Sequence, residues 1–294
     1  MYRIGIDAMG LSKGVTPVIE AVSYFFEEHS DVEFVVFGKK VHLQDLQEIS
    51  KLVDCLEVVD PTDSIDNIIK NEDNSLVKAL EYLKNGKIDA LVSGANSYVF
   101  LNGSIKTLEL FEEIKTPALA SLIPTSVYGE KVCLLDCGVS EDRSPQRLYM
   151  LSRMGRVLSQ VDKSLPNPSI RLLSTRYDNF KYNNETNKAI ELIKEKELQG
   201  FKETIQPRYM LTLENCDVVV CGGGEGDILI STLQASTKSF IQSLKRSFNQ
   251  NFSSKLGYFM AKSSLEPLKS NVDYKTYAAS LLIGFTSIVV KVPQ

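Results

Sequence analysis

The chain has 294 residues, of which 43% are hydrophobic, so it can bury a sizeable core in one large domain or two lobes. Its formal net charge of -4 argues against nucleic acid as the main partner, because nucleic-acid-binding proteins usually carry a basic surface. The spacings of the five cysteines and the presence of only two histidines argue against a structural zinc site and a histidine-dependent hydrolase. The first residues look like a strand rather than a signal peptide, and no apolar run is long enough to span a bilayer, so we expect a cytoplasmic protein.

Apolar runs typical of strands alternate with amphipathic runs typical of helices along most of the chain. The predicted strands are 3–8, 32–37, 56–59, 88–93, 117–123, 131–137, 170–174, 217–221 and 287–292, and the predicted helices are 17–28, 41–53, 65–84, 100–114, 144–160, 185–197 and 228–248. This alternation predicts an α/β protein with three layers and a mostly parallel sheet. The short turn between strands 117–123 and 131–137 predicts an antiparallel portion. We expect a single domain over 1–294, with a division into two lobes near 162–168 as an open alternative.

Four loops that follow predicted strands are rich in glycine and small polar residues. Parallel sheets bind ligands beyond the carboxyl ends of their strands, so we expect these loops to line one anion-binding cleft. The candidate residues in the loops are Asp7, Gly10, Ser93, Asn96, Asp136, Gly138, Asp142, Gly222, Gly223, Gly224, Gly226 and Asp227.

The loop G-G-G-E-G-D at Gly222–Asp227 lies between an apolar strand and a helical run. Glycine lets the backbone approach a ligand, and the N-terminus of the following helix favours an anion. The loop therefore predicts a cradle for phosphate or a carbonyl oxygen. The alternative is a tight turn in which Asp227 caps the helix. Neither the P-loop motif nor the dinucleotide-binding glycine motif is present.

Residues 228–272 form a basic amphipathic stretch that predicts a helical hairpin. Apolar residues recur at every fourth position from Phe240 to Met260, and Glu266 is the one acidic residue. The basic residues are Lys238, Lys245, Arg246, Lys255, Lys262 and Lys269. This pattern fits an anionic membrane surface or an acidic protein. A dimerisation or core-packing hairpin with a solvated basic face is the alternative.

A series of different short motifs follows in a fixed order along nearly the whole chain. They include I-G-I-D-A-M-G at Ile4–Gly10, I-D-A-L-V-S-G-A-N at Ile88–Asn96, L-L-D-C-G-V-S-E-D-R-S-P at Leu134–Pro145 and C-D-V-V-V-C-G at Cys216–Gly222. In these motifs the chain resembles the bacterial phosphate acyltransferase family. The resemblance implies acyl transfer from acyl carrier protein (ACP) to inorganic phosphate, giving acyl phosphate for phospholipid synthesis. It further implies a fold similar to the isocitrate/isopropylmalate dehydrogenase-like superfamily, a homodimer, and attachment of the hairpin to the inner face of the membrane.

The resemblance also implies roles for single residues. Lys181, Arg208 and the N–H groups of Gly222–Gly226 would hold phosphate, and Ser93 and Asn96 would donate hydrogen bonds to the developing oxyanion. Asn183 belongs to the same group of candidate catalytic residues, while Asp7 and Asp142 would orient neighbouring donors. No metal or cofactor is expected, because phosphate is already an anionic nucleophile.

The ligand loops depart from the family pattern. The sequence G-G-G-E-G-D stands where the family has D-G-F-T-G-N, and Leu11-Ser12 stand where it has G-D. Two alternatives follow: a CoA-dependent phosphotransacylase, and a catalytically impaired homologue that acts as a membrane or lipid-synthesis scaffold. A metal-dependent decarboxylating dehydrogenase is disfavoured, since the loops show no cluster of aspartates for a divalent ion.

Overall fold

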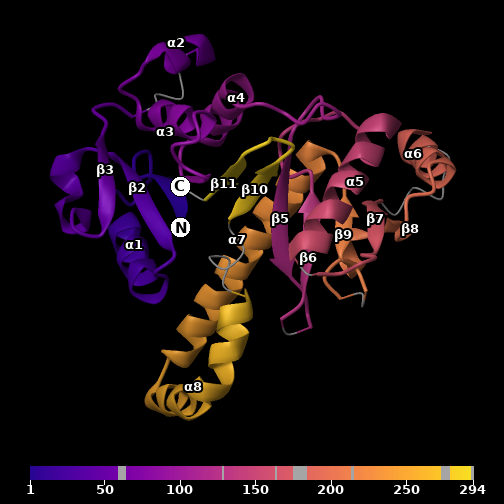
Figure 1. The fold of residues 1–294 in the computed structure, drawn as a ribbon. Helices are drawn as coiled ribbons and strands as arrows, with labels where there is room; N and C mark the ends of the chain where they lie inside the picture. The colour runs from indigo at the N-terminus through magenta and orange to yellow at the C-terminus, as the bar shows by residue number, and fades with distance from the viewer. Residues whose placement is uncertain are drawn as a thin grey trace. The chain divides into compact units, whose positions relative to one another are not determined.

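The computed structural model describes residues 1–58, 64–127, 129–162, 164–174, 184–212, 215–272 and 279–292 (Figure 1). For residues 184 and 264–272 it describes the backbone but not the side chains. The chain divides into two compact units. Unit 1 comprises Met1–Pro117 and Ser280–Gln294, and unit 2 comprises Ala118–Ala279. The segment 162–168, where the sequence left a division open, falls within the range of unit 2.

The sheet of unit 1 has its strands in the order β3-β2-β1-β4-β11-β10. The strands are β1 (Tyr2–Asp7), β2 (Val32–Gly38), β3 (Ser50–Asp54), β4 (Ala90–Ser93), β10 (Ser280–Ile283) and β11 (Ile288–Lys291). All neighbouring pairs are parallel except β10 and β11, which are antiparallel. The carboxyl ends of β1, β2, β4 and β11 therefore lie at one edge of this sheet.

Helices cover both faces of the unit 1 sheet. They are α1 (Thr16–Glu28), α2 (Ile65–Lys70), α3 (Ser75–Lys84) and α4 (Ser97–Thr107). Val18 and Val22 of α1 belong to one buried cluster with Val36 of β2. The neighbouring Phe37 points to the opposite face, where its ring lies 5.1 Å from that of Tyr82 in α3. The core of unit 1 therefore has a layer on each side of the sheet.

The sheet of unit 2 has the order β5-β6-β9-β7-β8. Its strands are β5 (Ala118–Pro124), β6 (Lys131–Leu135), β7 (Ile170–Leu173), β8 (Phe201–Ile205) and β9 (Val218–Val220). β5 pairs with β6 in antiparallel fashion, and the remaining pairs are parallel. The predicted antiparallel hairpin is confirmed, and the α/β class with a mostly parallel sheet is confirmed with it.

The helices of unit 2 also lie on both faces of their sheet. They are α5 (Pro145–Asp162), α6 (Asn184–Glu195), α7 (Gly223–Phe248) and α8 (Phe252–Val272). Gly155 of α5 lies so close to β9 that a Cβ there would be 2.5 Å from Cγ1 of Val218. Ile230 of α7 instead packs in a cluster with Val219. Because successive strand residues alternate between faces, α5 and α7 cover opposite sides of the sheet.

The predicted helix 41–53 is wrong. The segment forms two short 3-10 turns, Lys40–His42 and Gln44–Leu46, followed by the strand β3. Leu46 is fully buried in the cluster beneath α1, and β3 pairs with the edge of β2. Pairing with a sheet edge outweighs a short helical pattern, because it satisfies the main-chain groups of both strands.

The predicted helix 65–84 is two helices, because Asn74 begins a new one. Its side-chain oxygen accepts hydrogen bonds from the N–H groups of Leu76 and Val77, at 3.0 and 3.3 Å. Asparagine is a strong N-cap residue, so α2 and α3 are separated here. In the predicted strand 56–59, Glu57 forms an isolated bridge with Asn74, and residue 59 lies outside the described residues. The strands β8 and β10 were not predicted.

Candidate functional site

Three polar residues end neighbouring strands at the carboxyl edge of unit 1. Asp7 of β1 pairs with Ser93 of β4, and Ser93 pairs with Lys291 of β11. Residues paired in a parallel sheet direct their side chains to the same face. The carboxylate, the hydroxyl and the ammonium group therefore form a row on the face covered by α3.

Asp7 ties several loops of unit 1 together. Its side chain is 2% exposed, and its carboxylate accepts hydrogen bonds from Met9 N at 3.1 Å, Ser75 Oγ at 2.7 Å and Ser93 Oγ at 2.7 Å. Burial raises the pKa of Asp7, while these hydrogen bonds and the charge of Lys291 act in the opposite direction. Asp7 therefore connects the loops that follow β1 and β4 to the start of α3.

Ser93 and Asn96, the two predicted oxyanion donors, differ in whether they have a hydrogen-bond donor free for a ligand. Ser93 is fully buried; its hydroxyl donates to Asp7 and accepts from Ala95 N at 3.1 Å. Asn96 begins α4, and its Oδ1 accepts from Tyr98 N at 3.0 Å. Within the described part of the chain no partner takes the N–H donors of the Asn96 amide. Asn96 can donate to a ligand, whereas the Ser93 hydroxyl proton is already used by Asp7.

Gly10 lies beside this loop. Its φ of +79° is in the left-handed region, which favours glycine, and a Cβ there would be 3.5 Å from Cα of Ala95. The two unit 1 loops predicted from the sequence are therefore neighbours in the structure.

Lys291 and Ser75 are members of this cluster that sequence reasoning missed. Lys291 is 8% exposed, and its ammonium donates to the main-chain oxygen of Val292. Burial lowers the pKa of Lys291 to about 8, and the charge of Asp7 opposes this shift. In the sequence, Lys291 is marked only as the lysine that ends the apolar strand I-V-V-K, and Ser75 only as the serine in E-D-N-S-L. Neither signal reveals a partner that is distant in the sequence.

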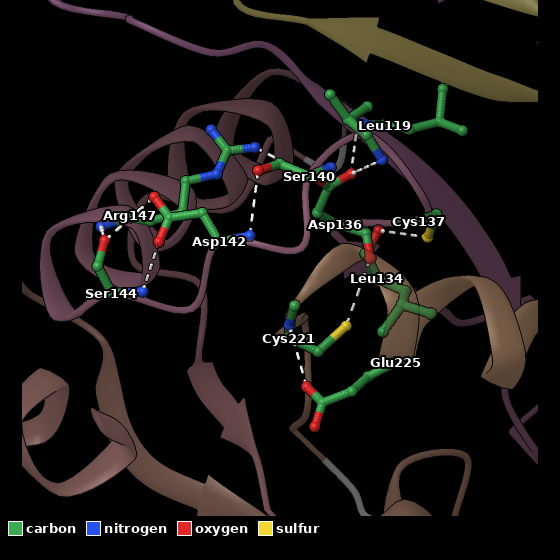
Figure 2. Close-up of polar contacts among 12 residues, drawn as sticks. Leu119, Leu134, Asp136, Cys137, Ser140, Asp142, Ser144, Arg147, Cys221 and Glu225 are labelled. Atoms are coloured by element: carbon green, nitrogen blue, oxygen red, sulfur yellow. Dashed lines mark hydrogen bonds and ion pairs between the residues drawn. The ribbon is translucent and has the colours of Figure 1, made fainter. Parts of the chain in front are cut away.

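In unit 2, Asp136 organises the loop after β6 (Figure 2). One carboxylate oxygen accepts from Leu119 N at 3.1 Å and Val139 N at 3.2 Å, and the other accepts from Ser140 N and from Arg147 Nη2, both at 3.1 Å. The group is fully buried, and burial raises its pKa against the effect of these donors. Because these donors come from β5, the loop after β6 and α5, Asp136 holds the loop in place.

Asp142 positions the start of α5. Its two oxygens accept from Ser144 N at 2.8 Å and from Ser144 Oγ at 3.2 Å, as Figure 2 shows. Ser144 Oγ in turn accepts from Arg147 N at 3.3 Å, which is an N-cap contact. Asp142 is itself exposed, so it orders a helix end that faces solvent.

The glycines of Gly222–Asp227 form the first turn of α7. Gly222 N donates to Glu225 Oε2 at 3.1 Å, Gly223 N to the Ser140 oxygen at 2.9 Å, and Gly226 N to the Gly222 oxygen at 3.0 Å. Gly222 is the N-cap residue, so the alternative in which Asp227 caps the helix is wrong. Gly224 is exposed, and its N–H has no hydrogen-bond partner among the residues that the structure describes. The main-chain N–H of Gly224 is thus open to a ligand.

Close packing explains most of these glycines. A Cβ on Gly226 would lie 1.8 Å from the main-chain oxygen of Asp136, and one on Gly223 would lie 2.6 Å from that of Ser140. Gly138 has a φ of +116° and faces Asp227, whose Cβ would be 3.6 Å from an added Cβ. The two predicted loops of unit 2 are therefore packed backbone to backbone.

A carboxylate of the chain itself occupies the N-terminus of α7. Glu225 accepts from Gly222 N and forms an ion pair with Arg143, and both side chains are about one-third exposed. A helix N-terminus favours an anion, and here Glu225 supplies one.

Arg208 lies in the 3-10 turn Pro207–Tyr209, after the carboxyl end of β8. It is exposed, with its guanidinium 5.6 Å from the ring centre of Tyr209. Lys181 and Asn183 lie outside the described residues. Two of the four predicted loops belong to unit 1 and two to unit 2, so the single cleft that they were expected to line stays a prediction.

No group of three or more histidine, cysteine, aspartate or glutamate side chains able to hold a metal ion occurs in the described part of the chain. Likewise, none of the helices within the described ranges is both long and apolar enough to cross a membrane.

The fold places this protein in a class of α/β proteins that includes solved phosphotransacylases. A branched-chain phosphotransacylase from Enterococcus faecalis V583 superposes with a TM-score of 0.60 at 15% identity, covering 99% of this chain and 91% of the other. A 4-hydroxythreonine-4-phosphate dehydrogenase from Klebsiella pneumoniae gives a TM-score of 0.53 at 14% identity, covering 99% and 90%. At such identities the likeness concerns the fold alone, and it confirms the prediction that the fold is similar to that of a dehydrogenase.

The chain belongs to the family described as fatty acid synthesis protein, whose family model matches residues 2–293. A phosphate acyltransferase from Staphylococcus epidermidis is 28% identical over 292 residues, which cover 99% of this chain and 89% of the relative. A phosphate acyltransferase from Caldicellulosiruptor bescii is 30% identical over 298 residues, covering 98% and 88%. The resemblance seen in the sequence motifs is confirmed.

Proposed function

We propose that this protein transfers an acyl group from the thioester of an acyl carrier protein to inorganic phosphate. The products are an acyl phosphate, which serves phospholipid synthesis, and the free thiol of the carrier. The observation that carries the proposal is the match to proteins named phosphate acyltransferase along 98–99% of the chain. The polar residues at the carboxyl ends of parallel strands support it, because α/β proteins bind ligands there.

The reaction asks for little covalent chemistry from the protein. Phosphate is already an anion, so the protein must position it, balance its charge and stabilise the oxyanion that forms on the thioester carbonyl. We assign the oxyanion role to the amide N–H donors of Asn96. Arg208, Lys181 and the open N–H of Gly224 hold phosphate, and Asn183 keeps the catalytic role that the resemblance implies.

The direct test is to incubate the purified chain with acyl-ACP and phosphate and to trap acyl phosphate with hydroxylamine. We expect hydroxamate that depends on phosphate. We also expect Asn96→Ala to lower kcat by about 10²-fold, as expected for loss of one oxyanion donor. Ser97→Ala, a change at a neighbouring exposed position, is the matched control and should leave the rate unchanged. Absence of hydroxamate from the wild-type chain refutes the proposal.

The shared fold with phosphotransacylases favours one alternative, in which acyl-CoA is the donor. Acyl-ACP and acyl-CoA with the same acyl chain, compared at equal concentrations, separate the two. The proposal requires a higher kcat/KM for acyl-ACP.

The Glu225 carboxylate at the N-terminus of α7 favours a second alternative, a scaffold without turnover. Such a protein binds lipid-synthesis partners, and Lys181→Ala changes nothing that it does. Retained membrane binding, with no acyl phosphate from either thioester, identifies this outcome.

We further propose that the hairpin of α7 and α8 attaches the protein to an anionic membrane surface. The helices lie side by side (Figure 1), with the rings of Phe248 and Tyr258 5.1 Å apart. Near their junction the apolar side chains of Phe252, Phe259 and Met260 are 81%, 76% and 77% exposed. Lys238, Lys245, Arg246, Lys255 and Lys262 are exposed as well. Apolar and basic side chains together on one exposed hairpin are typical of interfacial helices.

Vesicle sedimentation tests the hairpin. We expect binding to vesicles rich in phosphatidylglycerol, weak binding to phosphatidylcholine, and a strong loss on Phe252→Ser with Phe259→Ser. Phe111→Ser, an exposed phenylalanine of unit 1, is the matched control. Equal binding of the double variant and the wild type refutes membrane attachment. The resemblance also implies a homodimer, and we propose that this chain forms one. Sedimentation velocity of both proteins tests this, because loss of the dimer in the double variant assigns the exposed apolar side chains of the hairpin to contact with a second copy.

A further inference from the structure

We propose that Lys291 donates the proton that the departing thiolate requires, a role that rests on the acyl transfer proposed above. Lys291 ends β11 in the row with Ser93 and Asp7, at the edge where ligands bind in parallel sheets. Pairing of β11 with β4 brings Lys291 next to the strand whose following loop carries Asn96.

Among the described residues, the Lys291 ammonium group has more N–H donors than hydrogen-bond acceptors around it. Its ammonium has three N–H donors, and one of them goes to the main-chain oxygen of Val292. Within the described ranges no other hydrogen-bond partner contacts this group, although the residue is only 8% exposed. An ammonium group buried with unused donors is costly, so a polar ligand at this place stabilises it.

The acidity of Lys291 suits a thiol. Burial lowers its pKa to about 8, close to the value of about 8.5 for an ordinary thiol. General acids work best when their pKa lies near the operating pH, and an unperturbed lysine is too weak an acid for this task. Lysine at this position can therefore both lose and regain its proton during each turnover.

Asp7 tunes this acidity. Among the described residues it is the charged group that acts on Lys291, and its negative charge opposes the lowering of the lysine pKa. Ser75 and Ser93 hold Asp7 in place by hydrogen bonds. Cys55, which interacts with Asp7 and Lys78, has a pKa raised by burial to about 11, so it stays a neutral thiol near pH 8.

The proton balance is complete without another reactant. A phosphate oxygen of HPO4²⁻ forms a bond to the acyl carbon, and the carbon–sulfur bond breaks and leaves the electron pair on sulfur. The Lys291 ammonium gives its proton to that thiolate. The neutral amine then takes the proton of the acyl phosphate monoanion, which leaves acyl phosphate dianion, free thiol and the original ammonium group.

Leaving-group dependence tests this role. We compare wild type, Lys291→Met and Lys291→Arg with acyl-ACP and with the S-phenyl thioester of the same acid, whose thiol is markedly more acidic. Arginine keeps the charge but does not release its proton, so it guards against a variant that fails to fold. We expect both variants to lose about 10²-fold or more in kcat with acyl-ACP, the size of a general-acid effect, and to regain most of the rate with the phenyl thioester.

The pH profile gives a second readout. An ammonium donor must be protonated, so wild-type kcat with acyl-ACP should fall as the pH rises through about 8. This limb should be absent in Lys291→Arg and should move to lower pH in Asp7→Asn, which removes the charge that supports protonation. Lys51→Met, a change at an exposed lysine of β3, should retain both the rate and the profile.

The outcomes separate this role from the reaction itself. Acyl phosphate formation by the wild type, with equal losses for both thioesters in the Lys291 variants, overturns the proton-donor role and leaves the proposed function intact. A wild-type chain that forms no acyl phosphate from either thioester overturns both.

Discussion

Gly226 and Gly224 sit two residues apart in the first turn of α7, and alanine should have opposite effects at the two positions. A Cβ on Gly226 lies 1.8 Å from the Asp136 oxygen, whereas one on Gly224 meets nothing within 4 Å. To reach ordinary contact at 3.4 Å, the two main chains at Gly226 must separate by about 1.6 Å. That movement also strains the 2.9 Å bond from Gly223 N to the Ser140 oxygen.

The magnitudes follow from these contacts. Overpacking costs about 1–3 kcal/mol, and loss of a buried hydrogen bond adds about 0.5–1.5 kcal/mol. Replacing a helical glycine by alanine gains about 0.5–1 kcal/mol. We therefore expect Gly226→Ala to destabilise unit 2 by about 1–4 kcal/mol, and Gly224→Ala to stabilise it by about 0.5–1 kcal/mol.

Scanning calorimetry of the wild type and the two variants measures this difference as two shifts of Tm with opposite signs. Amide hydrogen exchange in the loop 136–140 shows whether the loss is local to the contact. Equal Tm values for the two variants would falsify the packing account of this glycine-rich turn.

Three further predictions concern charged or titrating groups. Arg147→Met leaves the buried Asp136 carboxylate without its cation and should cost about 3–5 kcal/mol in urea unfolding, with part recovered when Asp136→Asn is added; full stability of the single variant contradicts this. Burial raises the pKa of Cys137 to about 12. The contribution of its neutral thiol to the free energy of unfolding is therefore complete below the unfolded-state pKa near 9, and it is lost as the pH rises toward 12. The stability cost of Cys137→Ala should therefore shrink between pH 8 and about 11, and a constant cost speaks against the shift. Glu225→Gln removes a negative charge but keeps an oxygen for Gly222 N, so the KM for phosphate should fall; an unchanged KM places phosphate elsewhere.

Local sequence signals identified much of the scaffold. The apolar runs that lead to Asp7, Ser93 and Asp136 are strands, and each of these polar residues lies at the carboxyl end of its strand or directly after it. Strand followed by polar residue is a local pattern, so one sequence is enough to find it. The hairpin of residues 228–272 was visible for the same reason, since its periodicity is helical throughout.

The remaining features depend on contacts between distant parts of the chain. Lys291 acquires its neighbours because β11 pairs with β4, which is remote in sequence. The helical spacing of residues 41–53 gave way to the strand β3, which the free edge of β2 stabilises. The glycines of the α7 turn suggested a ligand cradle, but two of them are required by the backbone of the loop at Asp136. None of these partners can be read from the local sequence.

Unit 1 is built from both ends of the chain, and this has a consequence for how the protein is made. The chain is synthesised from its N-terminus, so β4 lacks its neighbour β11 until the segment from Ser280 onward emerges from the ribosome. Unit 2 is a continuous segment and can complete its sheet earlier. During that interval β4 presents an unpaired edge, which is a site for aggregation. Because β11 both covers this edge and delivers Lys291, a chain interrupted before Ser280 lacks the proton donor at the same time as it lacks a closed sheet. The row of Asp7, Ser93 and Lys291 is therefore complete only once β11 has been synthesised.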